Sequence, residues 1–372
     1  MPSSDSKSPD NRWEALNKVQ TPDESSDFSQ FKPEQNAVNR QSSLSEELNR
    51  KGYHPVMIFG TRATGKSSLL ASLFYYLQSD PESPAIALQG EFVIPTDTSY
   101  GQSVADAASH FLNHVVNNFH DGISTATTQD EQPFFVPVVL RPNNGQPEVK
   151  LAFLESKGEW YAIQRDSKNL YPRLKTEVAE VYEKFPKGIS ILLIAPYVIG
   201  EAYSDQGKTE WAQQEMRDSD TALFGALQAY QMHRVQRNLD KYLFLLTKWD
   251  AHTQSIIEKD FIDPRHGVVS KLISERYPKS WTLFQNMQPT VVRCMQYCAG
   301  IMSGNVRVPI PQHLKPIMNR FPQRLWQWLY FNSSGGAELF VSPKSPPKHV
   351  NEATKASASK TSLVTLVRKL LG

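Results

Sequence analysis

The sequence predicts a mixed α/β fold, with a mostly parallel sheet, helices on both of its faces and one antiparallel hairpin strand. Short apolar runs alternate along the chain with segments whose apolar residues have helical spacing. This alternation is typical of parallel strands joined by helices. An Asn143-Asn144-Gly145 turn between two of the apolar runs indicates the hairpin. No internal repeat interrupts the pattern.

The apolar runs give the expected order of elements. Strands are expected at 55–59, 134–140, 149–154, 189–196, 242–246 and 290–295. Helical spacing predicts helices at 69–77 and 104–116, two more polar helices at about 163–184 and 208–239, and an apolar closing helix at 323–331.

Composition narrows the class of protein. The 372 residues carry 40 Lys and Arg against 38 Asp and Glu, a net charge of +2, so no nucleic-acid partner is expected. Hydrophobic residues make up 40% of the chain, which is enough for a sizeable core. The two cysteines, Cys294 and Cys298, exclude a disulfide scaffold and fit a reducing compartment.

The sequence shows no targeting or membrane segment. Its first residues contain no apolar leader, and the longest apolar stretch, 189–200, is shorter than the roughly 20 residues of a membrane span. We therefore expect a soluble, cytoplasmic protein.

Polarity divides the chain into regions. Residues 1–50 are expected to be a disordered polar tail, although Ser43 and Glu46 form a capping-box pattern that predicts a short helix at its end. The expected regions that follow are a domain at 51–335 with insertions at about 79–132 and 160–187, a Pro/Ser/Lys-rich linker at 336–360, and a short basic amphipathic helix at 361–372. The apolar face of that last helix could dock on this chain or a partner protein, or make weak peripheral contact with an anionic membrane.

A phosphate-binding motif follows the first expected strand. Residues 60–67, GTRATGKS, match the P-loop pattern GxxxxGK[ST], and a helix is expected directly after them. In such a loop the backbone amides surround a diphosphate, the lysine reaches the β- and γ-phosphates, and the Ser hydroxyl binds Mg²⁺. The candidate phosphate-binding residues are Gly60, Thr61, Arg62, Ala63, Thr64, Gly65, Lys66, Ser67 and Ser68, with Lys66 also catalytic and Ser67 also a metal ligand.

A second motif is a candidate for contact with the base of a nucleotide. The strand expected at 242–246 is followed by Thr247-Lys248-Trp249-Asp250, which resembles the [NT]KxD motif of GTPases. In that family the Asp carboxylate accepts hydrogen bonds from guanine N1–H and the 2-amino group, and the Lys stem lies along the base. The resemblance implies that Thr247, Lys248 and Asp250 read guanine. A plain solvated loop after a strand is the alternative.

The expected hairpin carries a third motif. Its second strand ends at Glu155, and Gly158 follows three residues later. This pattern resembles the DxxG motif of Ras-like GTPases, in which the acidic residue holds Mg²⁺ through water and the glycine amide contacts the γ-phosphate. Glu155 stands where Asp is usual, and its longer side chain is expected to alter the Mg²⁺ geometry.

Together the three motifs resemble the translation-factor-related (TRAFAC) class of P-loop GTPases over roughly residues 53–332, most closely the divergent bacterial domains of multi-gene conflict systems. The resemblance implies a guanine-nucleotide-binding protein with GTP or GDP and Mg²⁺ as ligands. It also implies slow hydrolysis of GTP to GDP and phosphate, and effector or regulatory proteins as partners. A non-hydrolysing GTP/GDP-binding scaffold and an ATPase of the same fold are the alternatives.

Several positions depart from the family pattern. The water-orienting Gln has no counterpart, so Glu159 is the candidate for that role, and Arg62 is a candidate cation toward the γ-phosphate. Thr125, Thr127 and Thr128 are equivalent candidates for a switch threonine. A second base-contacting loop would fall at residues 297–300, and the cysteine pair is expected to pack and not to bind metal.

Overall fold

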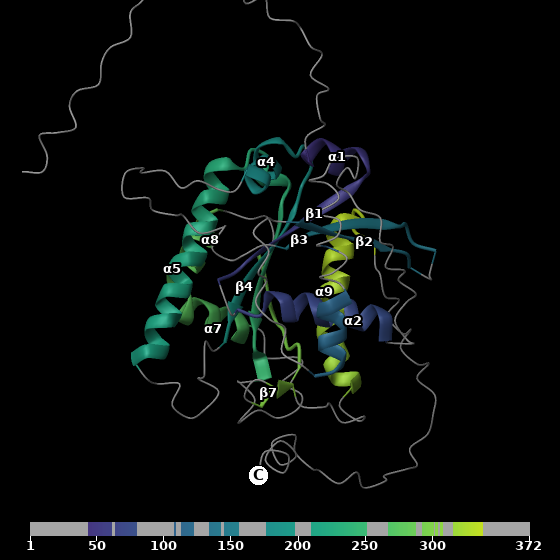
Figure 1. Ribbon diagram of the computed structural model, residues 1–372. Helices are drawn as coiled ribbons and strands as arrows, with labels where there is room; N and C mark the ends of the chain where they lie inside the picture. Colours follow the sequence, from purple (N-terminus) through teal and green to yellow (C-terminus); the bar gives the residue numbers. More distant parts are fainter. Residues whose placement is uncertain are drawn as a thin grey trace, which may run out of the picture. The chain divides into compact units, whose positions relative to one another are not determined.

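The computed structural model describes residues 44–61, 64–79, 108, 113–122, 134–142, 145–155, 176–197, 210–250, 267–287, 292–300, 302–303, 306–307 and 315–337 (Figure 1). The chain divides between Gln41 and Ser42, and every described residue belongs to the second unit. Helix α1, Leu44–Arg50, therefore belongs to the main unit, with Leu48 completely buried. The capping pattern predicted this helix at the end of the region 1–50; residues 1–43 lie outside the described chain.

Six strands among the described residues form one sheet in the order β2-β3-β1-β4-β5-β6. In chain order they are β1 Tyr53–Phe59, β2 Phe134–Leu140, β3 Val149–Glu155, β4 Ser190–Pro196, β5 Lys241–Thr247 and β6 Val292–Gln296. Strand β2 pairs antiparallel with β3, and the other neighbours in this sheet are parallel. The predicted strands and the predicted fold class are confirmed.

Burial explains why these segments form strands. Every residue of β4 is buried, and so is all of β5 after Lys241. A parallel strand covered on both faces needs a continuous apolar run, which is what residues 191–195 supply. Edge strand β2 tolerates Pro137, because an edge position does not require every backbone N–H.

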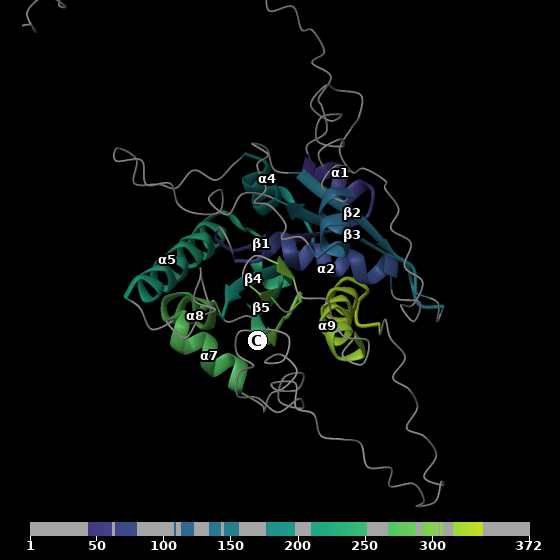
Figure 2. The ribbon, with the colours of Figure 1, turned by 60° about the horizontal axis from the view of Figure 1, so that its bottom comes forward.

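Helices cover both faces of the sheet (Figures 1 and 2). On one face, α2 and α9 pack together. The ring centroids of Phe74 in α2 and of Trp326 in α9 each lie 5.7 Å from the ring centroid of Phe153 in β3. On the other face, Phe59 of β1 lies 6.2 Å from Tyr182 of α4 and 6.4 Å from Tyr230 of α5. The helix bounds are α2 Lys66–Ser79, α4 Thr176–Lys184, α5 Glu210–His233, α7 Val268–Arg276, α8 Pro278–Asn286 and α9 Lys315–Ser333.

Several helices differ from the expectation. Helices α7 and α8 were not predicted; each has nine residues, which is shorter than the window over which a helical period is recognised. Helix α9 begins before the predicted 323–331 and contains Pro322. Helix α4 lies within the helix predicted at about 163–184, in the expected insertion at 160–187, and it contributes Val178, Val181 and Tyr182 to the core. In the predicted insertion at 79–132, residues 113–120 are helical and bury Val115, Val116 and Phe119. Short hairpin strands β7 Met302–Ser303 and β8 Val306–Arg307 were also not predicted.

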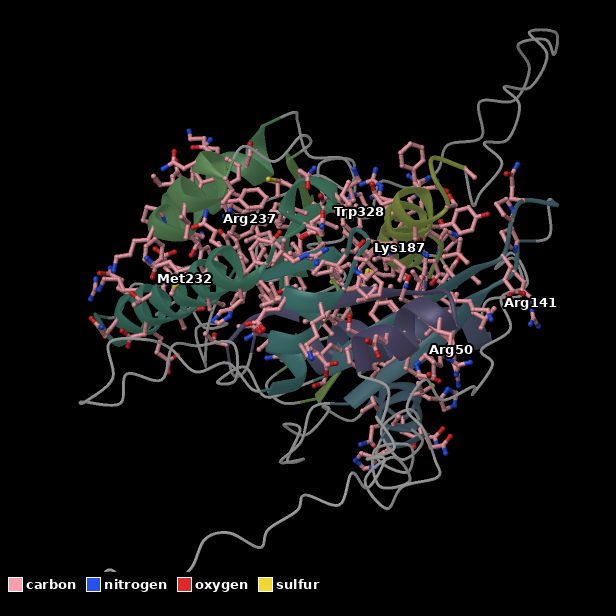
Figure 3. The ribbon with its side chains drawn as sticks, turned by 90° about the horizontal axis from the view of Figure 1, so that it is seen from above. Arg50, Arg141, Lys187, Met232, Arg237 and Trp328 are labelled. Carbon is pink, nitrogen blue, oxygen red and sulfur yellow. The ribbon has the colours of Figure 1, made fainter. Side chains whose placement is uncertain are left out.

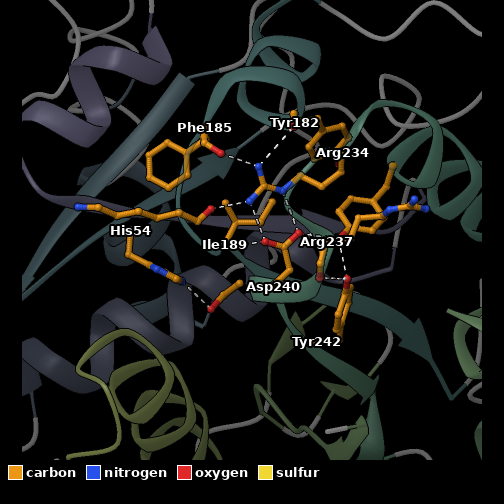
Figure 4. A network of polar contacts seen from close by, with 11 residues as sticks. His54, Tyr182, Phe185, Ile189, Arg234, Arg237, Asp240 and Tyr242 are labelled. Atoms are coloured by element: carbon orange, nitrogen blue, oxygen red, sulfur yellow. Dashed lines mark hydrogen bonds and ion pairs between the residues drawn. The ribbon is translucent and has the colours of Figure 1, made fainter. Parts of the chain in front are cut away.

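Helix α5 ends at His233, earlier than the predicted 208–239, because Arg234 turns inward (Figure 4). Its guanidinium bonds both carboxylate oxygens of Asp240, at 2.8 and 2.9 Å, and the carbonyl oxygens of Phe185 and Lys187, at 2.7 and 2.5 Å. The chain then passes through a short 3₁₀ turn, Arg237–Leu239, and enters β5.

The surface of this connection is partly apolar. Met232, Val235 and Leu239 are exposed, and Figure 3 shows Met232 and Arg237 on the face seen from above. No helix within the described ranges has the length and the hydropathy needed to cross a bilayer.

Candidate functional site

The loop after β1 lies at the point of the sheet where connections from neighbouring strands lead to opposite sides. Strand β1 lies between β3 and β4, so the connection from β1 leads to one side of the sheet, whereas the connection from β4 leads to β5 on the other. In open sheets of this kind, ligands bind beyond the carboxyl ends of the strands at such a point. The predicted phosphate-binding loop begins at Gly60, directly after Phe59, and therefore occupies this position.

Glycine at the start of the loop permits a close approach to the neighbouring strand. A Cβ on Gly60 would lie 2.7 Å from Thr64 Oγ1 and 3.0 Å from the Cβ of Ile194 in β4. Gly65, at the end of the loop, has a φ of +91°, a conformation that favours glycine. Between them, Thr64 Oγ1 donates a hydrogen bond to the carbonyl oxygen of Thr61 at 2.9 Å, which closes the loop on itself.

Lys66 begins α2 and lies against the inside of the loop. Its Nζ donates to the carbonyl oxygens of Gly60 and Thr61, both at 2.9 Å, and only 9% of the residue is exposed. Holding the ammonium in place lowers the entropy that it would lose on meeting an anion. The first turn of α2, in which Leu69 N donates to Gly65 O, adds the positive end of the helix dipole. Charge and dipole therefore meet at one place, as a phosphate site requires.

Ser67 and Ser68 are the second and third residues of α2, and both are half-buried. Their position in the first helical turn is the one that the P-loop pattern requires of a hydroxyl directed to Mg²⁺ or phosphate.

A hydrogen bond ties the TKWD segment to the phosphate-binding loop. Thr247 is the last residue of β5 and is buried, and its Oγ1 donates to the carbonyl oxygen of Thr64 at 2.9 Å. The two residues are 183 positions apart in sequence. The structure thus brings the two predicted motifs into one site.

The rest of the TKWD segment is anchored by its tryptophan. Trp249 is completely buried, whereas Lys248 and Asp250 on either side of it remain partly accessible. Lys248 has a φ of +53°, an uncommon conformation for a residue with a Cβ. Burial lowers the pKa of its ammonium, and the carboxylates of Asp250 and Glu215 act in the opposite direction.

The candidate second base loop lies beside this segment. Tyr297 N donates to Leu246 O at 2.8 Å, and Trp249 N donates to Tyr297 O at 3.3 Å. The Cys298 thiol lies close enough to Asp250 for that carboxylate to help burial raise the pKa of the thiol. Residues 297–300 therefore lie directly beside the TKWD segment, as the prediction of a second base loop requires.

The two cysteines are free, Cys298 buried and Cys294 half-buried. In the described part of the chain, no three His, Cys, Asp or Glu side chains gather as a metal site would require.

Strand β3 brings Glu155 to the same edge of the sheet. Strand β3 is parallel to β1, with Leu154 opposite Met57, and Glu155 is its last residue. Its backbone therefore ends beside the loop, although its side chain is not among those described. The other predicted site residues that lie outside the described chain are Arg62, Ala63, Gly158 and Glu159, together with the switch candidates Thr125, Thr127 and Thr128.

Sequence reasoning missed the contribution of α5. Ser219 of this helix has its Oγ 3.2 Å from Thr61 Oγ1 in the phosphate-binding loop. A single serine within a long polar helix has no characteristic spacing, so only the fold reveals this contact.

No family model matches the sequence, and no curated protein matches it. Solved structures do match by shape. The complex of GTP-bound SRb with SRX, from the signal recognition particle receptor of Chaetomium thermophilum, is 12% identical over 74% of this chain and 97% of that one, with a TM-score of 0.36. The Ski7 GTPase-like domain of S. cerevisiae, bound to GDP and inorganic phosphate, is 12% identical over 74% of this chain and 52% of that one, with a TM-score of 0.28. Sup35 complexed with GDP is 10% identical over 72% of this chain and 44% of that one, with a TM-score of 0.25.

This chain therefore spans about half of the matched Ski7 and Sup35 chains. None of these three structures supports the narrower resemblance to bacterial conflict systems, which stays a prediction. The fold itself is defined by this chain's own sheet order and by the position of its loop.

Proposed function

We propose that this protein binds guanine nucleotides through the loop after β1 and the TKWD segment after β5. One observation carries the proposal: the hydrogen bond from Thr247 Oγ1 to Thr64 O joins a phosphate-binding motif to a base-reading motif. Either motif alone occurs in other settings. Their direct contact at the switch point of the sheet is what a single nucleotide would need.

Each group has a part in this proposal. The backbone of residues 60–66 surrounds the phosphates, and Lys66 neutralises their charge. Asp250 accepts hydrogen bonds from the guanine N1–H and 2-amino groups, and adenine offers no such pair. Residues 297–300 cover the other side of the base. Ser67 and Glu155 would hold Mg²⁺, which, when bound, stabilises the charge that develops on the transferred phosphoryl group.

The favoured activity is slow hydrolysis of GTP to GDP and phosphate. Glu159 is the candidate to orient the attacking water, because it stands directly after Gly158, where the family has a glutamine. Slow turnover suits a switch that effector or regulatory proteins read, in the cytoplasm, with weak membrane contact through 361–372 as a further possibility to test. A scaffold that binds GTP or GDP without hydrolysis is the second candidate, and the replacement of Asp by Glu155 favours it.

Calorimetry on the full-length protein tests the proposal. GTP, GDP and ATP are titrated in the presence of Mg²⁺ into the wild type and into the variants Lys66→Ala and Asp250→Asn. We expect tight binding of GTP and GDP, a large loss in Lys66→Ala, and a loss of guanine preference in Asp250→Asn. Equal binding of ATP with no effect of Asp250→Asn would favour an ATPase and reject the guanine proposal.

Release of inorganic phosphate from bound GTP then separates a GTPase from a scaffold. Slow release that requires Mg²⁺ supports hydrolysis, and no release from a protein that binds GTP tightly supports the scaffold.

A further inference from the structure

The junction between α7 and α8 lies next to both halves of the candidate nucleotide site. Arg276 is the last residue of α7, Tyr277 separates the helices, and Pro278 begins α8. Arg276 and Tyr277 are neighbours in sequence, but their side chains bond to different parts of the framework that carries the site.

The side chain of Arg276 leads to the base-reading segment. Its Nη1 donates to Tyr197 O at 2.8 Å, and its guanidinium carbon lies 4.1 Å from the centroid of the Tyr197 ring. Tyr197 in turn contacts the TKWD segment twice. Its N–H donates to Thr247 O at 2.8 Å, and its ring packs edge-on against Trp249 with the centroids 6.1 Å apart. Trp249 lies between Lys248 and Asp250 in the sequence. A shift of Tyr197 would therefore shift Trp249, and with it the carboxylate of Asp250 that is proposed to bind the base.

The side chain of Tyr277 leads to the phosphate-binding loop. Tyr277 is completely buried, and its hydroxyl donates to Pro196 O at 2.7 Å. The same hydroxyl is hydrogen-bonded to Ser219, whose Oγ lies 3.2 Å from Thr61 Oγ1. Thr61 O accepts a hydrogen bond from the Lys66 ammonium. Hydrogen bonds through Ser219 and Thr61 therefore link the junction to Lys66, with the Thr61 hydroxyl bonded on one side and the Thr61 carbonyl oxygen on the other.

The junction is itself held rigidly by α5. The carboxylate of Asp220 accepts hydrogen bonds from the backbone N–H groups of Lys279 and Ser280, both at 3.0 Å, and from Ser280 Oγ at 2.6 Å. Asp220 follows Ser219 directly, so the helix that reaches the loop also caps α8. A fixed junction can set the position of both segments, whereas a mobile one could not.

We propose that Arg276 and Tyr277 are positioning residues for the nucleotide, Arg276 for the base and Tyr277 for the phosphates. This inference rests on the proposed function of the site. Arg276 acts through Tyr197 and Trp249, and Tyr277 acts through Ser219 and Thr61. Hydrogen bonds weaken steeply as their geometry departs from the optimum, so a small displacement of either segment reduces the affinity for the part of the nucleotide that it holds.

Two ratios of affinities measure the two halves separately. Inosine diphosphate lacks the 2-amino group of guanine, so the preference for GDP over inosine diphosphate reports the alignment of Asp250. GMP lacks the β-phosphate, so the preference for GDP over GMP reports the phosphate-binding loop. Both ratios are obtained on the full-length protein by displacement of a fluorescent GDP analogue.

The variants should affect these ratios selectively. Arg276→Gln is expected to lower the preference for GDP over inosine diphosphate by about three- to tenfold and to leave the preference over GMP unchanged. Tyr277→Phe, which removes one hydroxyl, is expected to do the reverse by a similar factor. Arg276→Lys retains the charge without the planar guanidinium and should fall between Arg276→Gln and the wild type.

Tyr242→Phe is the matched control. Tyr242 is also buried, and its hydroxyl donates to Arg237 O at 3.2 Å, at the opposite edge of the sheet. This variant should change neither ratio. If Arg276→Gln does not fold, Arg276→Lys answers the same question.

The outcomes separate the two proposals. Unchanged ratios in Arg276→Gln and Tyr277→Phe, with normal guanine binding by the wild type, would overturn the positioning roles alone. Equal losses of both ratios in both variants, in proportion to the loss of thermal stability, would also overturn them, because general loosening would then suffice. A wild type that binds no guanine nucleotide would refute the proposed function, and the positioning roles with it.

Discussion

At the scale of single residues, Gly60 determines whether the phosphate-binding loop can form. The loop turns directly after β1 while the side chain of Ile194 on β4 stands beside it. The space left at the Cα of Gly60 is smaller than a methyl group, since an added Cβ would lie 2.7 Å from Thr64 Oγ1 and 3.0 Å from Ile194 Cβ. The carbonyl oxygen of Thr64 also accepts the hydrogen bond from Thr247, so a displaced Thr64 would disturb the TKWD segment as well.

Gly60→Ala is therefore expected to impair both stability and binding. We expect a loss of about 1–3 kcal/mol in the free energy of unfolding from overpacking, and at least a tenfold (about 1.4 kcal/mol) loss of nucleotide affinity. Urea unfolding and calorimetry with GDP measure the two effects. Gly145→Ala is the control, because Gly145 has a φ of +75° but no atom within 4 Å of an added Cβ. It should lower stability alone, and normal GDP binding by Gly60→Ala would show that the loop does not need this close approach.

At the scale of elements, α5 organises the face of the sheet that leads to the site. Ser219 reaches the phosphate-binding loop, Asp220 caps α8, and Arg234 ends the helix by bonding the carbonyl oxygens that follow α4. One helix thus fixes the start of α8 near the carboxyl ends of the strands and the turn into β4 near their beginnings.

Removing the cap should loosen α8. Asp220→Ala deletes the acceptor of two backbone N–H groups and one hydroxyl, and it is expected to lower the free energy of unfolding by about 1–2 kcal/mol. Asp218→Ala is the control on the same helix, since Asp218 is exposed and accepts a single hydrogen bond, from Gln214 Nε2. Its effect should stay within about 0.5 kcal/mol. Equal effects of the two variants in urea unfolding would mean that the cap does not stabilise α8.

Breaking the buried ion pair that follows α5 should lower stability more than removing the cap of α8. The side chains of Arg234 and Asp240 are both 0% exposed and joined at 2.8 Å. Asp240→Asn leaves the guanidinium charged and without its partner, and we expect a cost of about 3–5 kcal/mol. Glu148→Gln breaks an ion pair at the surface, in which the side chains of Glu148 and Arg141 are 39% and 42% exposed. This change should cost less than about 1 kcal/mol. Chemical denaturation of both variants measures the contrast; comparable losses would contradict it.

The sequence predicts an element well when the residues of that element determine it, and poorly when contacts with distant segments do. Strands β4 and β5 are predictable because burial on both faces demands an uninterrupted apolar run. The loop and the TKWD segment could be located in the sequence because the motifs that they resemble have fixed residues at fixed spacing. Helices α7 and α8 and the roles of Ser219 and Tyr277 are not predictable, because each is defined by contacts between segments about 60 residues apart or more. The early end of α5 likewise depends on an acceptor, Asp240, that becomes available only when the next strand is in place.

At the scale of the whole molecule, the two edges of the sheet have different tasks. The carboxyl ends of the parallel strands carry the candidate nucleotide site. The beginnings of the strands carry a buried polar network instead, in which Arg234, Asp240, Tyr230 and Tyr242 are joined, and His54 at the start of β1 bonds Ser190 at the start of β4 (Figure 4). Conditions that alter this second edge should therefore change global stability without altering nucleotide recognition directly.

Lowering the pH should destabilise the fold by protonating His54. Burial lowers the pKa of His54 to about 4, whereas the imidazole titrates near 6.5 in an unfolded chain. Between these values the unfolded state binds a proton that the folded state does not, so the free energy of unfolding falls as the pH falls, by about 2 kcal/mol from pH 7 to pH 5. Carboxylates such as Glu47, whose pKa is lowered by its hydrogen bond to Arg50, add losses at lower pH, so the difference from His54→Gln isolates the imidazole. Urea unfolding from pH 7 to pH 5 should show a steeper decline for the wild type than for His54→Gln. Parallel curves would show that the His54 imidazole binds protons in the folded protein as it does in the unfolded chain, so that burial does not lower its pKa. The affinity for GDP, measured over the same range, should show the same pH dependence in both proteins, because the imidazole lies at the beginning of β1, away from the loop that follows this strand.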